Sequence, residues 1–199
     1  KASGPTMNAA TAPTAVSSLS FSITGGTGTI NWSTSGYNST NHTTLVFVKA
    51  TSSVTTGTPS SDPSGYTASS ALGSGTAYQN DAAAYCVYNG DGTSATVTGL
   101  AGGTTYYILV YTVVSAANSN ATYSYSSAVT TSAIGNTEYT WIGGASGSWA
   151  TSTNWSPTRS APAATDALIF DGPSSITCTN VPSQSIAKLL VKSGSSVVL

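Results

Sequence analysis

The stretch Ser94–Val114, SATVTGLAGGTTYYILVYTVV, decides the fold of this chain. A β-branched run leads to Gly99 and Leu100, a Gly-Gly turn follows, and a second apolar strand places Tyr106 six residues after Leu100. At this kind of corner in a β-sandwich, a leucine closes one end of the core and a tyrosine hydroxyl hydrogen-bonds back to the backbone. The spacing therefore predicts a sandwich with a corner formed by Leu100 and Tyr106.

The composition favours an all-β protein with a hydroxyl-rich and weakly charged surface. Hydrophobic residues make up 39% of the 199 residues, charged residues make up 6%, and the net charge is -1. Ser and Thr form about a third of the chain, whereas about a quarter of a soluble domain is usually charged. The five basic residues are scattered, so nucleic-acid binding lacks its electrostatic driving force. The longest apolar run, Tyr106–Tyr111, is too short to cross a bilayer, and we expect no membrane insertion.

Alternation of apolar and polar residues predicts a series of strands on both sides of the corner. The strands expected in the first part of the chain cover residues 18–23, 29–33, 44–48, 85–88, 94–97, 106–114 and 125–131. Asn89-Gly90-Asp91-Gly92 separates two of these runs, and Asn-Gly between β runs predicts a hairpin.

The strand after the corner is apolar on both faces. Tyr106 and Ile108 should face the sandwich core, so Tyr107 and Tyr111 should face the opposite side, where a solvent-exposed face would be polar. Residues 50–84 form a long insertion, and a structureless loop of that length is improbable in a compact domain. We expect the insertion to cover the second face, and the alternative is an exposed binding surface.

The composition changes near Gly135. Three of the four tryptophans follow within a short segment, together with short strands separated by Gly, Pro and Ser turns. Such a series predicts the opening coil of a β-solenoid, capped by tryptophans, or a small β-sandwich. The expected organisation is an N-terminal arm at 1–12, a sandwich at 13–134 and a second β-rich module at 135–199. The chain stops within an apolar pattern at Val197–Leu199, so we expect a piece of a longer protein.

Two parts of the chain resemble known families. Residues 11–132 resemble the fibronectin type III-like modules of secreted surface proteins from Bacteroidetes-type bacteria, through Val87–Gly90, Val97–Leu100 followed by Gly103–Tyr107, and Trp32. Residues 140–199 resemble the entry segment of β-helical adhesins and autotransporter-like proteins, and the motif comprises Trp141-x-Gly143, Gly147-x-Trp149, Asn154-Trp155, Pro162 and Asp166. These resemblances imply an extracellular or cell-surface location and a role in adhesion, surface structure or support of polysaccharide breakdown.

The residues present argue against catalysis. The one histidine, His42, is expected in a loop without an orienting carboxylate, which a Ser–His–acid relay requires. Glycoside hydrolysis needs paired carboxylates, and Asp166 and Asp171 should face opposite sides of a regular strand. Asp166 is expected instead to cap backbone at the strand entrance. Two Cys and one His do not form a zinc cluster, so we expect no metal and no cofactor.

Five aromatic residues and two cysteines are the remaining candidates. Trp141, Trp149, Trp155, Tyr107 and Tyr111 are candidates for stacking on sugar rings. Alternatively, the tryptophans form a core or cap and the tyrosines lie under the insertion, and we favour burial.

The two cysteines leave a second choice open. In an exported protein Cys86 and Cys178 could be joined by a disulfide, or they could remain two buried thiols that never meet. Sequence alone does not place their Cα atoms within bonding range.

The sequence therefore predicts an extracellular, non-catalytic, structural or adhesive module of a bacterial cell-surface protein: a stalk, adhesin or fibre subunit. Its partners would be other subunits or neighbouring domains. The alternative is a carbohydrate-binding accessory module of a larger secreted polysaccharide-degrading protein, with glycans as partners.

Overall fold

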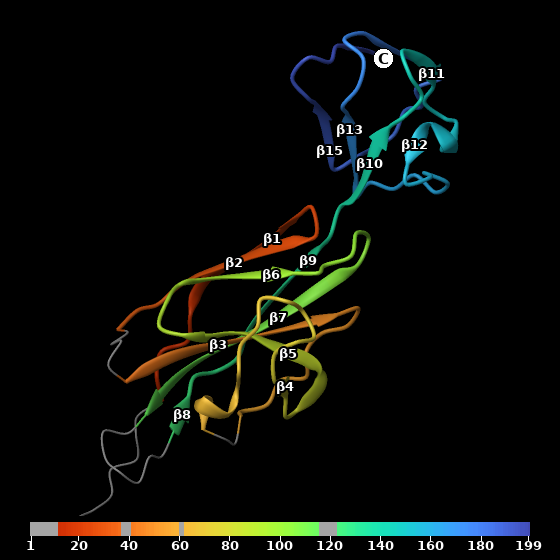
Figure 1. Cartoon of the computed structure of the whole chain (residues 1–199). Coiled ribbons are helices and arrows are strands. Elements are labelled where there is room, and N and C mark those ends of the chain that lie inside the picture. Colours follow the sequence, from red (N-terminus) through yellow and green to blue (C-terminus); the bar gives the residue numbers. More distant parts are fainter. Residues whose placement is uncertain (1–11, 37–40, 60–61, 116–122) are drawn as a thin grey trace, which may run out of the picture. The chain divides into compact units, whose positions relative to one another are not determined.

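A computed structural model describes residues 12–36, 41–59, 62–115 and 123–199. The described part is all-β, with two single-turn 3-10 segments at Pro63–Gly65 and Ser152–Asn154, so the predicted fold class is confirmed. The chain divides into two compact units near Ile134 (Figure 1). Almost all of the predicted arm at 1–12 lies outside the described residues.

The first unit is a sandwich of two sheets. One sheet has the order β1-β2-β6, and the other has the order β4-β5-β3-β7-β8, with β9 also pairing with β7. Figure 1 shows the long strands β3 and β7 side by side, and their antiparallel register runs from His42↔Val114 to Ala50↔Tyr106. The strands are β1 (Ser17–Thr24), β2 (Thr27–Ser33), β3 (His42–Ala50), β4 (Ala77–Tyr78), β5 (Asp81–Gly90), β6 (Ser94–Thr98), β7 (Thr105–Ser115), β8 (Tyr123–Tyr125) and β9 (Val129–Ile134).

The sandwich core contains the two residues of the predicted corner. Leu100 and Tyr106 are both buried and belong to one hydrophobic cluster, together with Ile30 and Trp32 from the opposite sheet. Alternate residues of one strand share a face, which places Ile30 and Trp32 on the inner side of β2, as expected. The corner thus joins the two sheets at a shared core.

The predicted hairpin at Asn89–Gly92 is wrong. Strand β5 continues through Gly90 and pairs with β3, whereas β6 pairs with β2 in the other sheet. The segment is a crossover between the layers. The Asn89 side chain donates hydrogen bonds of 2.8 Å to the carbonyl oxygens of Pro63 and Tyr66, which holds this strand end against the insertion.

Two further details differ from the prediction. His42 is the first residue of β3, where its Nδ1 lies 2.9 Å from the Asn41 side-chain oxygen, and it does not lie in a loop. The predicted strand at 125–131 is split into β8 and β9. At the break, the Thr112 amide donates to the Ser126 hydroxyl at 3.0 Å, so a side chain replaces a regular strand partner.

The insertion covers the second face of β7, as predicted. Val54, Tyr66 and Tyr78 from the insertion pack with Leu109 and Tyr111 of β7 in a second buried cluster. Aromatic rings make up much of its interior: Phe47 and Tyr78 have ring centroids 4.5 Å apart. The central sheet is therefore buried on both faces, which explains the apolar run in the sequence.

The second unit has the strand arrangement of a β-solenoid. Strands β10, β13 and β15 run parallel in one sheet, and β11, β14 and β16 run parallel in a second. Each pair of consecutive strands, β10 with β11, β13 with β14 and β15 with β16, thus forms one rung. The strands are β10 (Thr137–Trp141), β11 (Ser146–Ser148), β12 (Trp155–Ser156), β13 (Asp166–Phe170), β14 (Ile176–Thr179), β15 (Lys188–Val191) and β16 (Val197–Val198).

The first rung is covered by β12, which pairs antiparallel with β10 and places Trp155 opposite Trp141. The rings of Trp141 and Trp149 each lie 5.1 Å from the Trp155 ring in edge-to-face geometry. Phe170 from the second rung packs against all three. The tryptophans therefore form the core at the capped end of the solenoid, in line with the expectation of a tryptophan cap.

A buried ion pair joins the segment after β12 to the first residue of β13. Arg159 Nε lies 2.7 Å from Asp166 Oδ2, and both side chains are buried. Asp166 also accepts a hydrogen bond of 2.9 Å from the Ala163 amide, so the expectation that it caps backbone at the strand entrance is confirmed. Asp171 instead pairs with Lys192 at the surface.

Candidate functional site

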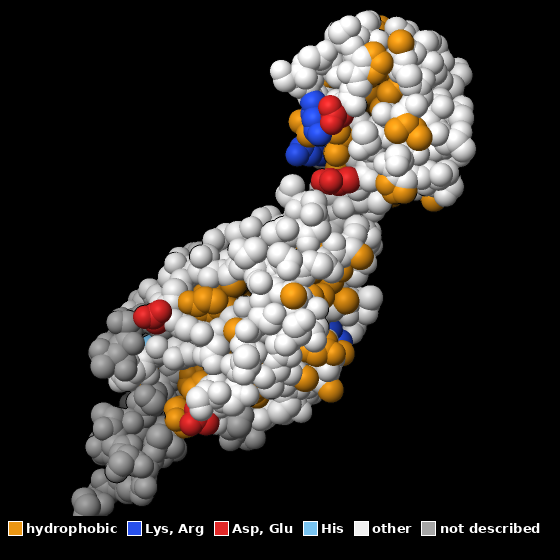
Figure 2. Space-filling view, viewed as in Figure 1, with side chains coloured by type: hydrophobic (Ala, Val, Ile, Leu, Met, Phe, Trp, Pro, Cys, Tyr) orange, Lys and Arg blue, Asp and Glu red, His pale blue; other side chains and the backbone are white. Residues whose placement is uncertain are grey.

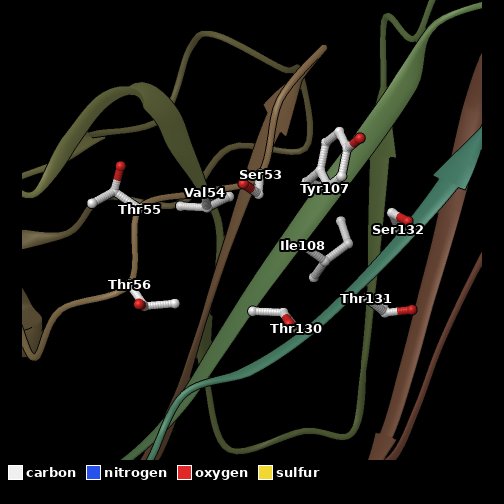
Figure 3. Close-up of a pocket in the computed structure, with 9 residues that line it drawn as sticks. All are labelled: Ser53, Val54, Thr55, Thr56, Tyr107, Ile108, Thr130, Thr131 and Ser132. Carbon is white, nitrogen blue, oxygen red and sulfur yellow. The ribbon is translucent and has the colours of Figure 1, made fainter.

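A groove of about 630 Å³ lies on the first unit beside Tyr107. Its floor comes from β7, one wall from the segment that follows β3, and the other wall from β9 (Figure 3). The volume falls in the range of small-molecule sites. The lining residues are Ser53, Val54, Thr55, Thr56, Tyr107, Ile108, Thr130, Thr131 and Ser132.

The wall formed by Ser53–Thr56 is held at both ends. The Thr51 amide donates to the Thr105 carbonyl oxygen at 2.8 Å, and the Thr55 amide donates to Asp81 Oδ2 at 2.9 Å. Asp81 also pairs with Lys49, whose Nζ lies 2.8 Å from the same oxygen. Since Lys49 is the register partner of Tyr107 on β3, this ion pair lies next to the groove floor.

The ionisation of Asp81 follows from these contacts. Burial disfavours the charged carboxylate, but hydrogen bonds from Lys49 and from the amides of Thr55 and Ala83 outweigh it and lower the pKa below its usual range. The carboxylate therefore stays ionised and keeps the wall attached to the sheet at neutral pH.

The two candidate tyrosines have different positions. Tyr107 is half-buried and lines the groove, packing at the edge of the second cluster. Tyr111 is buried, and its hydroxyl bonds to the Gly57 backbone, so it cannot stack on a ligand. The favoured alternative, in which the insertion covers the tyrosines, therefore holds for Tyr111, whereas Tyr107 stays partly accessible.

The tryptophan candidates are all buried. Trp141, Trp149 and Trp155 are at most 3% exposed and pack on one another in the solenoid core. Of the two alternatives that the sequence left open, the favoured burial of the tryptophans as a core or cap is therefore correct, and no ring face is accessible for stacking on a sugar. Their burial follows from the need to cover the first rung.

The cysteines form no disulfide. Cys86 and Cys178 are both free and buried, each in the core of a different unit. Burial raises the pKa of the Cys86 thiol to about 12 and also raises that of Cys178. Of the two alternatives left open by the sequence, the two separate buried thiols are correct.

A smaller pocket of about 280 Å³ lies near the end of β8 and the 3-10 turn at Pro63–Gly65. Its acidic group is Asp62, which accepts hydrogen bonds of 2.7 Å from the Tyr123 hydroxyl and from the Ser64 amide. The bond from Tyr123 is the main reason that the pKa of Asp62 is lowered. The carboxylate is thereby engaged in holding the turn.

Within the described ranges, no three His, Cys, Asp or Glu side chains gather where they could hold a metal ion. In the same part of the chain, no helix has the length and apolar character required to cross a membrane.

Sequence reasoning identified only Tyr107 among the groove residues. The other lining residues are mainly Ser and Thr from two separate segments, in a chain where about a third of the residues are of these types. No local pattern marks them, because only the packing of the insertion and β9 beside β7 brings them together.

No protein-family model and no curated protein matches the sequence. Among solved structures, the chain is similar to the fibronectin type III domain of human fibronectin type III domain containing protein 3, with 14% identity and a TM-score of 0.37, over 65% of this chain and 94% of that one. It is also similar to pectate lyase PelI from Erwinia chrysanthemi in complex with tetragalacturonic acid, with 14% identity and a TM-score of 0.31. That match covers 92% of this chain and 45% of the lyase. Neither likeness assigns an activity, and the expected relation to bacterial surface proteins stays a prediction.

Proposed function

We propose that this chain is a non-catalytic structural or adhesive module of a bacterial cell-surface protein, located outside the cell. The observation that carries the proposal is the engagement of most acidic side chains in structural contacts within all-β units of low charge.

The acidic residues support a non-catalytic role because most of them have structural contacts. Asp81 and Asp166 form ion pairs inside their units, Asp171 pairs with Lys192, and Asp62 holds Tyr123. These are four of the six acidic residues of the chain. A general acid or base must have a proton-transfer face open to substrate, and these contacts occupy the carboxylates.

The surface chemistry also suits close packing of neighbours. The face drawn in Figure 2 consists mainly of backbone and uncharged side chains, with few charged groups. Burying charged groups in an interface carries a large desolvation penalty. A surface of hydroxyl groups lowers that penalty and exchanges water hydrogen bonds for bonds to a partner.

Electron microscopy of the native, source-purified protein, labelled with an antibody against this chain, tests the proposal. We expect label on fibres or on a cell-surface layer. Label confined to dispersed single particles, or to the cytoplasm, would contradict it.

A further inference from the structure

We propose that the groove beside Tyr107 binds a neutral saccharide. The proposal is independent of the structural role above, because that role makes no use of the groove on the sandwich. It deepens the sequence-level alternative of glycan recognition by assigning it to one site and one class of sugar.

The lining of the groove determines the charge of its ligand. None of the nine lining residues is charged, and six of them carry aliphatic hydroxyl groups. A charged ligand would lose water here without gaining an opposite charge in the groove, which is unfavourable. A ligand rich in hydroxyl groups can exchange its hydrogen bonds to water for bonds to Ser and Thr, each of which both donates and accepts.

Tyr107 provides the apolar surface that a sugar ring requires. Its ring is half-buried, packs on one side against the second cluster and lines the groove. Figure 3 shows the ring standing on β7 between the wall of Ser53 and the wall of Ser132. A pyranose ring has an apolar face of C–H groups, and a flat aromatic ring with a polar hydroxyl matches both the face and the edge of such a ligand.

The site is built before any ligand arrives. Tyr107 is held by the continuous pairing of β3 with β7. The facing wall is held by the Thr55–Asp81 hydrogen bond and by the Tyr111–Gly57 hydrogen bond. Preorganisation lowers the entropic cost of ordering the walls on binding, which matters for a ligand whose individual hydrogen bonds add little net free energy.

Titration calorimetry and amide NMR of the full chain with hexasaccharides of glucose, xylose and mannose test the proposal, and oligogalacturonate serves as the acidic comparison. We expect at least one neutral sugar to bind and to shift the amides of Tyr107 and Thr130–Ser132. Absence of binding by all the neutral sugars, or preference for the acidic one, would overturn it.

Two variants localise the site. Tyr107→Ala should weaken binding about tenfold, the equivalent of one lost aromatic contact, whereas Tyr107→Phe should stay within about threefold, because it keeps the ring. Tyr85→Ala is the matched control, since Tyr85 is also half-buried but does not line the groove. Equal loss in Tyr107→Ala and Tyr85→Ala would overturn the assignment.

A third variant keeps the test informative if Tyr107→Ala does not fold. Thr130 is exposed on β9 at the groove, and Thr96 is exposed on β6 in the other sheet. Thr130→Arg should abolish detectable binding by filling the groove, whereas Thr96→Arg should bind as wild type does. Retained sugar binding in Thr130→Arg would place the ligand elsewhere, and capture of an extended polypeptide in place of a sugar would also overturn the proposal.

Discussion

The hydroxyl of Tyr111 donates a hydrogen bond of 2.7 Å to the carbonyl oxygen of Gly57, although 54 residues separate the two in the chain. The same carbonyl accepts a hydrogen bond from Tyr78, whose hydroxyl in turn accepts one of 3.0 Å from Asn80. The insertion is thus attached to β7 through its backbone, and the attachment lies next to the wall of the groove. Contacts of this kind convert a Gly- and Ser-rich segment into a fixed surface.

Removing this hydroxyl should weaken the attachment without creating a cavity. We expect Tyr111→Phe to lower the free energy of unfolding by about 1 kcal/mol, because the half-buried Gly57 carbonyl loses one of its two tyrosine donors. Hydrogen exchange of the β3 and β7 amides measures the change in the first unit alone. Tyr107→Phe is the control and should shift the free energy of unfolding by less than about 0.5 kcal/mol. Similar losses in both variants would contradict the structural role of Tyr111.

Gly75 should be intolerant of any side chain. A Cβ at this position would lie 2.0 Å from the carbonyl oxygen of Cys86, which is fixed in β5. We expect Gly75→Ala to destabilise the first unit by about 1–3 kcal/mol, because the backbone must shift to relieve the overlap. Gly65→Ala is the control, since its Cβ would meet nothing within 4 Å. The measurement is thermal unfolding, and an unchanged midpoint for Gly75→Ala would show that the insertion packs differently.

Trp155 should be the residue on which the solenoid unit depends most. It is 1% exposed, its ring contacts two other tryptophans and Phe170, and its Nε1 donates to the Trp149 carbonyl oxygen at 3.0 Å. Trp155→Ala should cost about 3–5 kcal/mol through the cavity that it leaves. Hydrogen exchange of the β13 and β14 amides measures this loss of stability as a loss of protection. Ile142→Ala is the control, since Ile142 is 59% exposed and its replacement should leave the protection unchanged. Retained protection in Trp155→Ala would contradict a capping role.

We expect joint replacement of Arg159 and Asp166 to destabilise the protein less than the two single replacements together. Each single variant, Arg159→Met or Asp166→Leu, leaves a buried charge without its partner and should cost about 3–5 kcal/mol. The double variant should lose less than the sum, because apolar groups then face each other. A double-mutant cycle in chemical denaturation measures the coupling. Strictly additive losses would indicate that the two charges do not interact in solution.

Acid should weaken the first unit through Asp81. Its pKa is lower in the folded state than in the unfolded chain, so the unfolded chain binds more protons in this range. The stabilisation is complete above the ordinary aspartate pKa of about 4 and is lost as the pH falls through the lowered value. Asp81→Asn should therefore lose stability at neutral pH and show a flatter acid dependence than wild type. Identical slopes for wild type and Asp81→Asn would contradict the assignment.

Local patterns predicted most strands of the sandwich because the alternation of apolar residues depends only on neighbours in the chain. The β3 and β7 strands, the Leu100–Tyr106 corner and the covered second face all follow from it. The Asn89–Gly92 hairpin does not, since a turn signal does not specify whether the next strand stays in the same sheet. Here the Asn89 amide holds the insertion, and the chain crosses to the other layer.

The candidate site was predictable only in part. Tyr107 stood out because an aromatic residue on the outer face of a strand requires an explanation. Its hydroxyl-bearing neighbours, such as Thr55 and Thr130, lie more than 70 residues apart in the chain and carry no distinguishing pattern. The tryptophans show the opposite case, since the sequence favoured their burial as a core or cap and they form the core of a capped rung.

By itself the sequence determined the all-β class and the corner that closes the sandwich, because these depend on periodicity and composition. For the second module it left a β-solenoid and a small β-sandwich open, and the parallel pairing of the strands decided between them. Only the tertiary structure decided which aromatic residues are accessible, that Cys86 and Cys178 stay apart, and that Ser53–Thr56 and Thr130–Ser132 face each other across Tyr107. Burial and proximity are set by long-range packing, and packing joins residues that no local pattern relates.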